Sequence, residues 1–218
     1  IKRKFLMTEQ KIRKDIIKFS KLLNKTNLSP LRSGNISVRY KNGFLITPSG
    51  MRYETLKSKD IVFVDLRGKY NPKKNKPSSE WHFHKDIYLN KKNANSVVHC
   101  HSKNALVLSC IRKKIPAFHY MVAVAGGIDI KCAKYATYGT TQLSKNIIQV
   151  LKDRFGCLIE NHGQVAFSNN IQNAIELAQE IEYLAEQYLE CLRVGKPKIL
   201  KVAEMNKVLS KVKNYKKQ

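Results

Sequence analysis

A hairpin signal constrains the fold of this chain more than any other feature. Two strand-like segments, 36–40 and 44–47, flank Asn42-Gly43, a dipeptide that favours the tight turn between antiparallel strands. Residues 157–160 and 165–167 form a similar pair, a strand followed by its hairpin return. Pairs of this kind predict a central sheet that is largely antiparallel.

Helical segments alternate with these strands. Residues 8–25 repeat apolar side chains every three or four positions, with Thr8 placed as an N-cap. The same reasoning predicts further helices at 80–90, 103–112, 143–151 and 171–192, strands at 61–64 and 96–101, and a strand or apolar turn at 121–127. We therefore expect one α/β domain over residues 1–218, with helices on both sides of the sheet in a three-layer α/β/α arrangement.

The formal charge is +25, from 41 Lys plus Arg against 16 Asp plus Glu. Such a balance can indicate nucleic-acid binding. The basic residues are scattered along the chain, however, without a nucleic-acid-binding pattern, and we expect no nucleic-acid partner. A positive field would also concentrate an anionic, phosphorylated substrate near the protein.

Cysteine usage and hydropathy indicate the cellular environment in which the protein functions. The five cysteines are an odd number without a CxxC pair, which predicts reduced thiols in a reducing compartment. The sequence contains no apolar run of the roughly 18 residues that a membrane-spanning helix needs. The charged start, Ile1 to Lys4, lacks a following apolar segment of secretory type. We expect a cytoplasmic protein without a membrane partner.

Three histidines form a candidate metal site. His99 and His101 are two positions apart on a predicted strand, so both side chains point to one face, with their Cα atoms about 6.6–6.8 Å apart, while Cys100 points to the other. The alternative is a pair of half-exposed histidines on a sheet. His162 follows a second strand and precedes Gly163, where the chain can turn tightly. Three neutral histidines leave a coordination position open, which is typical of catalytic zinc.

Pro77-Ser78-Ser79-Glu80 begins a predicted helix and has two interpretations. The hydroxyls and free amides can bind an anion, with Glu80 next to it as an acid or base. The alternative is a simple helix cap with an acidic first turn. His82 and His84 diverge by about 200° on a helix, so they are not expected to share a metal, and His84 is expected to pack near the core.

Two small-residue turns, 33–35 and 47–50, can also direct backbone N–H groups at an anion. Each is a weak signal alone. Together with the histidines and Glu80, they belong to an ordered series of motifs that resembles the class II aldolase/adducin family, specifically its L-fuculose-1-phosphate aldolases. The motifs are Gly34-Asn35-Ile36-Ser37-Val38-Arg39-Tyr40, Leu45-Ile46-Thr47-Pro48-Ser49-Gly50, Pro77-Ser78-Ser79-Glu80-Trp81, Val97-Val98-His99-Cys100-His101, Ile115-Pro116-Ala117-Phe118-His119-Tyr120-Met121, Tyr135-Ala136-Thr137-Tyr138-Gly139-Thr140 and Asn161-His162-Gly163.

The resemblance implies a zinc-dependent lyase of carbohydrate (fucose) metabolism that cleaves L-fuculose 1-phosphate reversibly to dihydroxyacetone phosphate and L-lactaldehyde. It implies zinc on His99, His101 and His162, with Glu80 moving between metal and substrate as the acid/base. It also implies a homotetramer in which Tyr120 reaches a neighbouring subunit's site as a catalytic residue. Phosphate binding is implied for Gly34, Asn35, Ser49, Gly50, Ser78 and Ser79.

The chain departs from the family at the aldehyde end and beside one phosphate turn. Tyr138 stands where Phe is common, Tyr215 fits one of two C-terminal aromatics, and Val212 occupies the other position. Arg32 either adds a phosphate contact or points to solvent. Aldolases for 5-deoxyribulose or 5-methylthioribulose 1-phosphate and a non-catalytic adducin-like binding module remain as alternatives. The related ribulose-phosphate 4-epimerases carry Asp where Glu80 stands, which argues against an epimerase.

Overall fold

The computed structural model describes residues 8–215, and their side chains as far as Val212. The predictions for the charged start, Ile1 to Lys4, and for the Tyr215 side chain therefore lie outside the described residues. The helices are α1 Glu9–Lys25, α2 Trp81–Asn90, α3 Lys103–Cys110, α4 Thr141–Val150, α5 Ile171–Val194 and α6 Val202–Tyr215. The strands are β1 Asn35–Tyr40, β2 Gly43–Ile46, β3 Val62–Asp65, β4 Ser96–Cys100, β5 Cys132–Ala133, β6 Gly156–Ile159 and β7 Gly163–Ser168. Short 3-10 helices are η1 Tyr53–Thr55, η2 Ser58–Asp60 and η3 Tyr120–Ala125.

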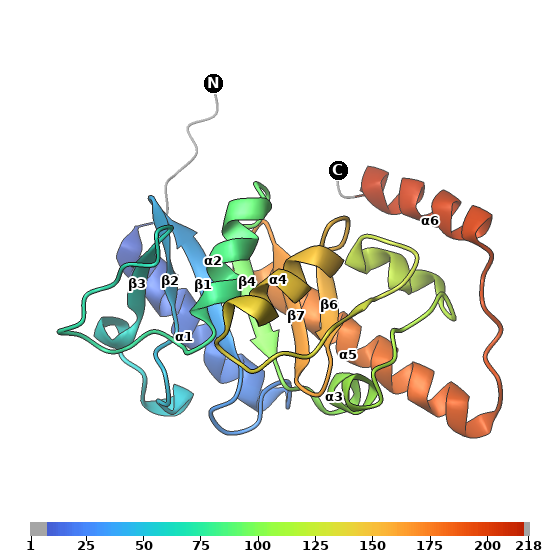
Figure 1. The fold of residues 1–218 in the computed structure, drawn as a ribbon, viewed down its shortest axis with the longest axis horizontal. Helices are drawn as coiled ribbons and strands as arrows, with labels where there is room; N and C mark the ends of the chain where they lie inside the picture. Colours follow the sequence, from blue (N-terminus) through green and yellow to red (C-terminus); the bar gives the residue numbers. More distant parts are fainter. Residues whose placement is uncertain (1–7, 216–218) are drawn as a thin grey trace.

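The strands form one seven-stranded mixed sheet in the order β3-β2-β1-β4-β7-β6-β5 (Figure 1). Every neighbouring pair is antiparallel except β5 and β6, so the prediction of a largely antiparallel sheet is confirmed. The β1–β2 hairpin turns through Asn42 and pairs Tyr40 with Gly43, as the sequence predicted. At the centre, His99 on β4 pairs with Asn35 on β1 and with Val165 on β7. This strand order brings three distant parts of the chain together.

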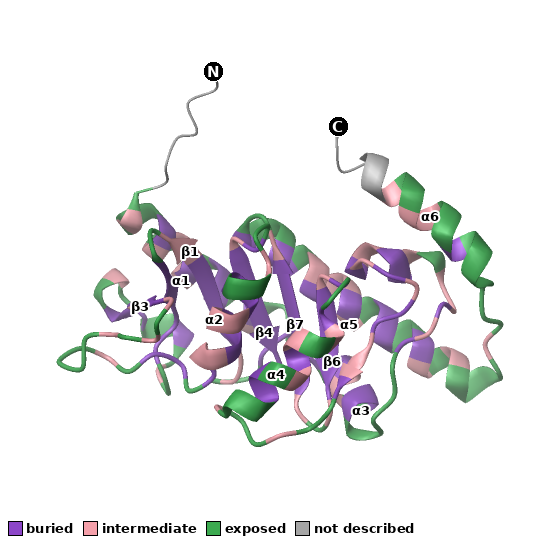
Figure 2. Cartoon of the chain, turned by 45° about the horizontal axis from the view of Figure 1, so that its top comes forward, coloured by how far each residue is buried: buried purple, intermediate pink, exposed green. Residues whose placement is uncertain are grey.

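Two hydrophobic clusters fill the spaces on opposite faces of the sheet, whose strands are largely buried (Figure 2). Val98 and Cys100 pack in the cluster with α1, α3 and α5, whereas Val97 packs in the cluster with α2 and α4. Successive side chains of a strand alternate between its faces. His99 therefore shares the α2 face with Val97, and Cys100 points to the opposite face, as predicted.

The N-terminal helix forms where its periodicity predicted it. The Thr8 hydroxyl accepts a hydrogen bond from the Lys11 amide (3.3 Å), which caps α1. The buried side of α1 is apolar and packs on the sheet through Ile12, Ile16, Phe19 and Leu23.

Three elements differ from the sequence prediction or go beyond it. Of the strand and the apolar turn that were predicted for residues 121–127, the structure has the turn: the chain forms η3, which Gly126 ends with a positive φ of 99°. Strand β5 is only two residues long, too short for a periodic signal. Helix α6 was not predicted; it follows an extended segment and stands beside η3 at the edge of the molecule (Figure 1). Met205 is the fully buried side chain that anchors α6.

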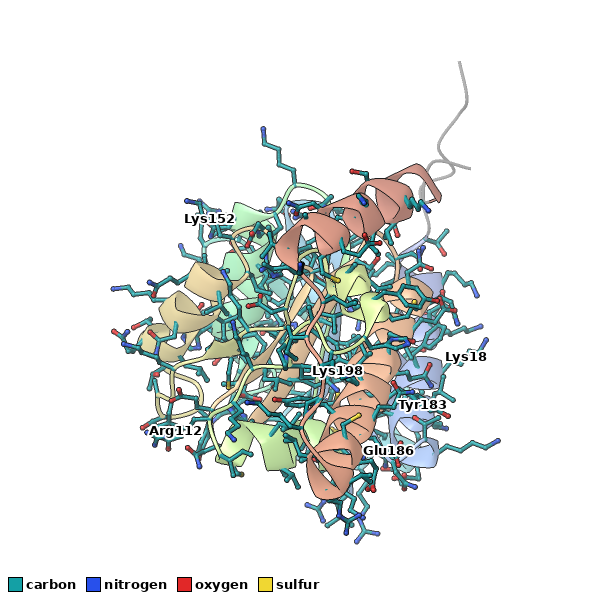
Figure 3. The ribbon with its side chains drawn as sticks, turned by 90° about the vertical axis from the view of Figure 1, so that its right-hand side faces the viewer. Lys18, Arg112, Lys152, Tyr183, Glu186 and Lys198 are labelled. Carbon is teal, nitrogen blue, oxygen red and sulfur yellow. The ribbon has the colours of Figure 1, made fainter. Side chains whose placement is uncertain are left out.

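The surface lysines are spread over separate elements. Lys18 on α1 and Lys152 after α4 project from opposite sides of the molecule in Figure 3. Within residues 8–215, none of the helices combines the length and apolar character needed to cross a membrane.

Candidate active site

The three predicted histidines come together at one end of the central strands. His99 lies on β4, His101 follows the last residue of that strand, and His162 lies in the turn between β6 and β7. The Nε2 atoms of His99 and His101 are 3.0 Å apart. The ring centroid of His162 lies 4.8 Å from that of His99 and 5.0 Å from that of His101. His99 is fully buried, so the alternative of a pair of half-exposed histidines on a sheet is wrong.

A tight backbone approach places His162 beside β4. Cys100 pairs with Gln164 across the β4–β7 ladder, and Gly163 between His162 and Gln164 has φ +147°. A Cβ atom on Gly163 would lie 2.5 Å from the Cys100 carbonyl oxygen. A glycine is required here because any side chain would push the turn, and the His162 ligand with it, away from the strand.

The orientation of His99 is set by the neighbouring strand. Its Nδ1 atom donates a hydrogen bond to the backbone carbonyl of Gln164 (2.8 Å), so in the neutral imidazole the Nε2 lone pair is directed at the cluster. The Gln164 side chain donates in turn to Ser102 Oγ (2.8 Å) and the Ala178 carbonyl (3.1 Å). Sequence reasoning missed Gln164, because a backbone carbonyl carries no residue-specific signal.

Glu80 joins the histidines instead of capping its helix. It occupies the N-cap position of α2, but its side chain makes no capping hydrogen bond. The carboxylate is buried, with Oε2 3.1 Å from His99 Nε2 and Oε1 3.2 Å from His162 Nε2. The interpretation of Glu80 as a simple cap is therefore wrong.

Burial and charge act in opposite directions on these groups. Burial alone would raise the pKa of Glu80, but the His99 and His162 imidazoles outweigh it and bring that pKa well below its usual range. Burial would lower the pKa of His99, but Glu80 and the Gln164 carbonyl raise it overall. Burial, followed by the charges of His99 and His162, lowers the pKa of His101 to about 3. In the metal-free protein the carboxylate is thus ionised and His101 is neutral at pH 7.

The donor set fits a divalent metal ion. One ligand atom each from Glu80, His99, His101 and His162 lies within 4.8 Å of the others. In a tetrahedral zinc site, nitrogens about 2.0–2.1 Å from the ion are about 3.3 Å apart, close to the observed His99–His101 separation. Glu80 Oε1 is buried and makes no hydrogen bond of good geometry with the described residues, although His162 Nε2 lies 3.2 Å away, and a cation would satisfy this oxygen. These four side chains can hold the metal.

A cavity of about 340 Å³ opens beside the cluster. Most of the predicted substrate-binding residues line it together with the ligands: Gly34, Asn35, Ser49, Gly50, Ser78, Ser79 and Tyr138, with Glu80, His101 and His162. Its wall also contains Ser33 and Pro48, which belong to the two small-residue turns, and Tyr135 and Asn161, to which the sequence assigned no role. Tyr135 and Asn161 stand inside the quoted motifs, so their position could have indicated a role.

Arg32 lies on the wall of this cavity, and its Nη1 donates to the Gly50 carbonyl (3.3 Å). The guanidinium thereby bridges the two small-residue turns at 33–35 and 47–50. No atom lies within 4 Å of the position that a Cβ on Gly50 would occupy, so the second turn is open to the cavity. A larger cavity, about 520 Å³, lies by β3 and contains none of the predicted site residues.

Tyr120 does not line the 340 Å³ cavity within the described part of its own chain. It begins η3 and its side chain is 53% exposed. Tyr215, the other aromatic assigned to the aldehyde side, has no described side chain. Among the described residues, one chain therefore brings together the metal cluster and the small-residue turns, but not Tyr120.

His84 is buried in the core beside the site, as predicted. Its Nδ1 contacts Ser37 Oγ (2.7 Å) and its Nε2 contacts Asn35 Oδ1. Asn35 Nδ2 donates to Glu80 Oε2 (3.1 Å), so this side chain serves the carboxylate as well as lining the cavity. Sequence reasoning had assigned Asn35 to the phosphate alone.

Comparison with known proteins places this fold and site in one family. The model of the Class II Aldolase and Adducin N-terminal domain matches residues 14–189. A 5-methylthioribulose-1-phosphate/5-deoxyribulose-1-phosphate aldolase of Rhodospirillum rubrum is 44% identical over 204 residues, which cover 94% of this chain and 92% of that protein. The L-fuculose phosphate aldolase of Escherichia coli K12 is 42% identical over 210 residues, covering 96% and 97%.

Solved structures agree with the sequence relatives. An L-fuculose 1-phosphate aldolase structure superposes with a TM-score of 0.89 at 37% identity, covering 93% of this chain and 96% of that one. The chain belongs to the class II aldolase and adducin family. More particularly, it is a class II aldolase, and therefore a lyase, with a Glu/His/His/His cluster of the kind that a divalent metal requires.

Proposed function

We propose that this chain is a zinc-dependent aldolase that cleaves a ketose 1-phosphate reversibly to dihydroxyacetone phosphate and an aldehyde. The observation that carries the proposal is the position of Glu80, whose carboxylate lies among three histidines at the wall of a cavity lined by serines and glycines. Zinc is favoured because three imidazoles and an exchangeable carboxylate suit its tetrahedral preference.

The proposed substrate is L-fuculose 1-phosphate, with L-lactaldehyde as the aldehyde product. The E. coli relative and the structural relative with a TM-score of 0.89 both bear that activity in their names. The R. rubrum relative supports a second candidate, 5-methylthioribulose or 5-deoxyribulose 1-phosphate. These substrates share the phosphorylated end and differ at the aldehyde end, where the Tyr138 side chain is exposed at the cavity wall.

Cleavage requires two proton transfers around one carbon–carbon bond. The bond between C3 and C4 breaks, the C4 hydroxyl loses its proton and becomes the aldehyde, and C3 gains a proton. Because the Glu80 carboxylate beside the cavity is ionised, it first takes up a proton, which balances the one that the C4 hydroxyl releases to solvent, and then delivers it to C3. A bound divalent metal supplies Lewis-acid stabilisation of the negative charge that develops on the substrate oxygens.

The phosphate is far from the reacting bond, so its binding serves orientation. We assign it to the two turns and the start of α2, through Gly34, Asn35, Ser49, Gly50, Ser78 and Ser79. Ser78 and Ser79 immediately precede Glu80, so a phosphate held there would lie next to the acid/base. We assign Arg32 to the same anion, because its guanidinium lies on the cavity wall.

We further propose that Tyr120 acts in the site of a neighbouring subunit of a homotetramer, on the proton of the C4 oxygen. Its exposed side chain at the start of η3, outside its own chain's cavity, supports this assignment. Tyr120→Phe should lose turnover in the pure variant. Mixed tetramers of Tyr120→Phe and Glu80→Gln subunits should regain part of the activity, because some sites then combine an intact residue from each subunit.

The central experiment measures bound metal and the release of dihydroxyacetone phosphate from three substrates: L-fuculose, 5-deoxyribulose and 5-methylthioribulose 1-phosphates. We expect stoichiometric zinc, release from at least one substrate, and loss of release on chelation. Glu80→Gln should retain much of the zinc yet lose about 10²–10⁴-fold in kcat. Glu186→Gln, at an exposed position on α5 (Figure 3), is the matched control and should behave as wild type. Absence of release from all three substrates would refute the aldolase proposal.

A further inference from the structure

A chain of hydrogen bonds leads from the core of α2 to the carboxylate of Glu80. Tyr88 Oη lies 2.7 Å from Ser37 Oγ, and Ser37 Oγ lies 2.7 Å from His84 Nδ1. His84 Nε2 contacts Asn35 Oδ1, and Asn35 Nδ2 lies 3.1 Å from Glu80 Oε2. The links alternate between β1 and α2, so the two elements are joined through polar side chains as well as apolar ones.

The direction of each hydrogen bond in this series follows from the residue at its end, Glu80. An ionised carboxylate only accepts hydrogen bonds, so Asn35 must face Glu80 with its NH₂ group. Asn35 Oδ1 then accepts from His84, which places the imidazole proton on Nε2. His84 Nδ1 therefore accepts from the Ser37 hydroxyl. Ser37 has no second hydrogen, so its oxygen accepts from the phenol of Tyr88.

These polar side chains are buried, which makes their arrangement costly to change. Ser37 and His84 are fully buried, and Asn35 and Tyr88 are each 2% exposed. A buried polar group that loses its partner costs about 1–3 kcal/mol. Burial lowers the pKa of His84 to about 3 and raises the pKa of Tyr88, so both stay neutral at pH 7. The hydrogen-bonded series thus keeps one protonation pattern around pH 7.

An amide can rotate by 180°, and here the two orientations differ in what they offer Glu80. In the observed orientation, Asn35 presents a donor to Oε2. In the rotated orientation, it would present a carbonyl oxygen to a carboxylate oxygen, which is repulsive. Rotation would also place the Asn35 NH₂ group against the His84 Nε2–H, so two donors would meet. The proton on His84 Nε2 therefore excludes the unfavourable orientation.

We propose that His84 is a positioning residue for Glu80. Ser37 and Tyr88 hold the His84 imidazole in its Nε2–H tautomer. That imidazole fixes the Asn35 amide so that the amide always donates to the Glu80 carboxylate. This inference rests on the proposed role of Glu80 as the acid/base. The hydrogen bond from Asn35 holds Oε2 in place 3.1 Å from His99 Nε2. It also supports the carboxylate when Glu80 exchanges between metal and substrate.

The kinetic test compares two substitutions of His84 in the zinc-loaded enzyme. His84→Leu removes the donor to Asn35, and kcat should fall about 10–100-fold, the usual effect of losing a partner behind a catalytic or metal ligand, with KM changed less than about twofold. His84→Gln retains an N–H group near the Nε2 position and should recover most of the loss. If both variants keep wild-type kcat while their melting temperatures fall, His84 is only a core residue and the proposal is wrong.

A second measurement does not depend on turnover or on metal. In ¹⁵N NMR spectra of the chelated protein at pH 7, we expect the His84 proton on Nε2 and none on Nδ1. Ser37→Ala, which removes the donor to Nδ1, should yield a mixture of His84 tautomers in the same spectra. A proton on Nδ1 in the wild-type protein would overturn the proposal, whether or not any ketose phosphate is cleaved. If the tautomer is as expected but no substrate is cleaved, the proposed function fails while the hydrogen-bond arrangement stands.

Discussion

Gly163→Ala tests whether backbone geometry, not just ligand identity, builds the metal site. Gly163 follows His162 and has φ +147°, a conformation that residues with a Cβ rarely adopt. A side chain in such a region costs about 1–3 kcal/mol. The added Cβ would also meet the Cys100 carbonyl oxygen at 2.5 Å, so β4 and the turn must separate. For a chain of this size, 1–3 kcal/mol corresponds to a fall in melting temperature of about 2–12 °C.

The same substitution should weaken metal binding. The new Cβ would lie 3.1 Å from His101 Cδ2 and 3.3 Å from His101 Cα, and it is covalently one residue from His162. Two of the three histidines would therefore shift by tenths of an ångström. We expect zinc affinity to fall about 10–100-fold, as it does when the groups that orient a ligand are disturbed.

The assay is thermal unfolding by circular dichroism in excess chelator, followed by a competitive zinc titration of the folded protein. Gly195→Ala is the matched control, because Gly195 has extended backbone geometry and no atom lies within 4 Å of the position that a Cβ there would occupy. That control should unfold within about 0.5 kcal/mol of wild type and bind zinc equally well. If Gly163→Ala behaves like Gly195→Ala in both measurements, the argument from close backbone approach is refuted.

Three further predictions concern charge. Burial would raise the pKa of Asp129, but Arg154 and Lys114 outweigh burial and lower it. Asp129→Asn should therefore lower the free energy of unfolding by about 1.5–3 kcal/mol at pH 7, as measured in urea titrations. This difference should shrink as the pH falls through the lowered pKa of Asp129. The folded protein resists protonation of His84, whose pKa is about 3, whereas the unfolded chain gains that proton near pH 6.5. His84 should therefore make unfolding of the chelated protein about 2 kcal/mol easier at pH 5 than at pH 8, and His84→Gln should lack this contribution. Arg32→Met should raise KM for the cleaved ketose phosphate about two- to tenfold at unchanged kcat, and the difference from wild type should be smaller in high salt. Equal KM values for the variant and the wild type would place Arg32 in solvent.

Local patterns in the sequence determined much of the framework. The Asn42-Gly43 hairpin, helix α1 with its Thr8 cap, and the shared face of His99 and His101 all follow from short-range geometry, namely turn preferences and the periods of helix and strand. The small-residue turns and the serines before Glu80 lie on the wall of one cavity, and their assignment to the phosphate stays a prediction. These features need only the nearest few residues along the chain, so a single sequence suffices to predict them.

Tertiary structure decided the features that depend on which distant segments become neighbours. Glu80 looked as much like a helix cap as an acid/base, and only the β1-β4-β7 strand order, with α2 packed on the same face as His99, turned its carboxylate toward the histidines. The same packing placed Ser37 and Asn35 on β1 against His84 on α2. The hydrogen bonds from Asn35 to Glu80 and between Ser37 and His84 join residues 45 or more positions apart, and no local propensity encodes them. The sequence thus specified the chemical groups, and the order of strands specified which of them meet.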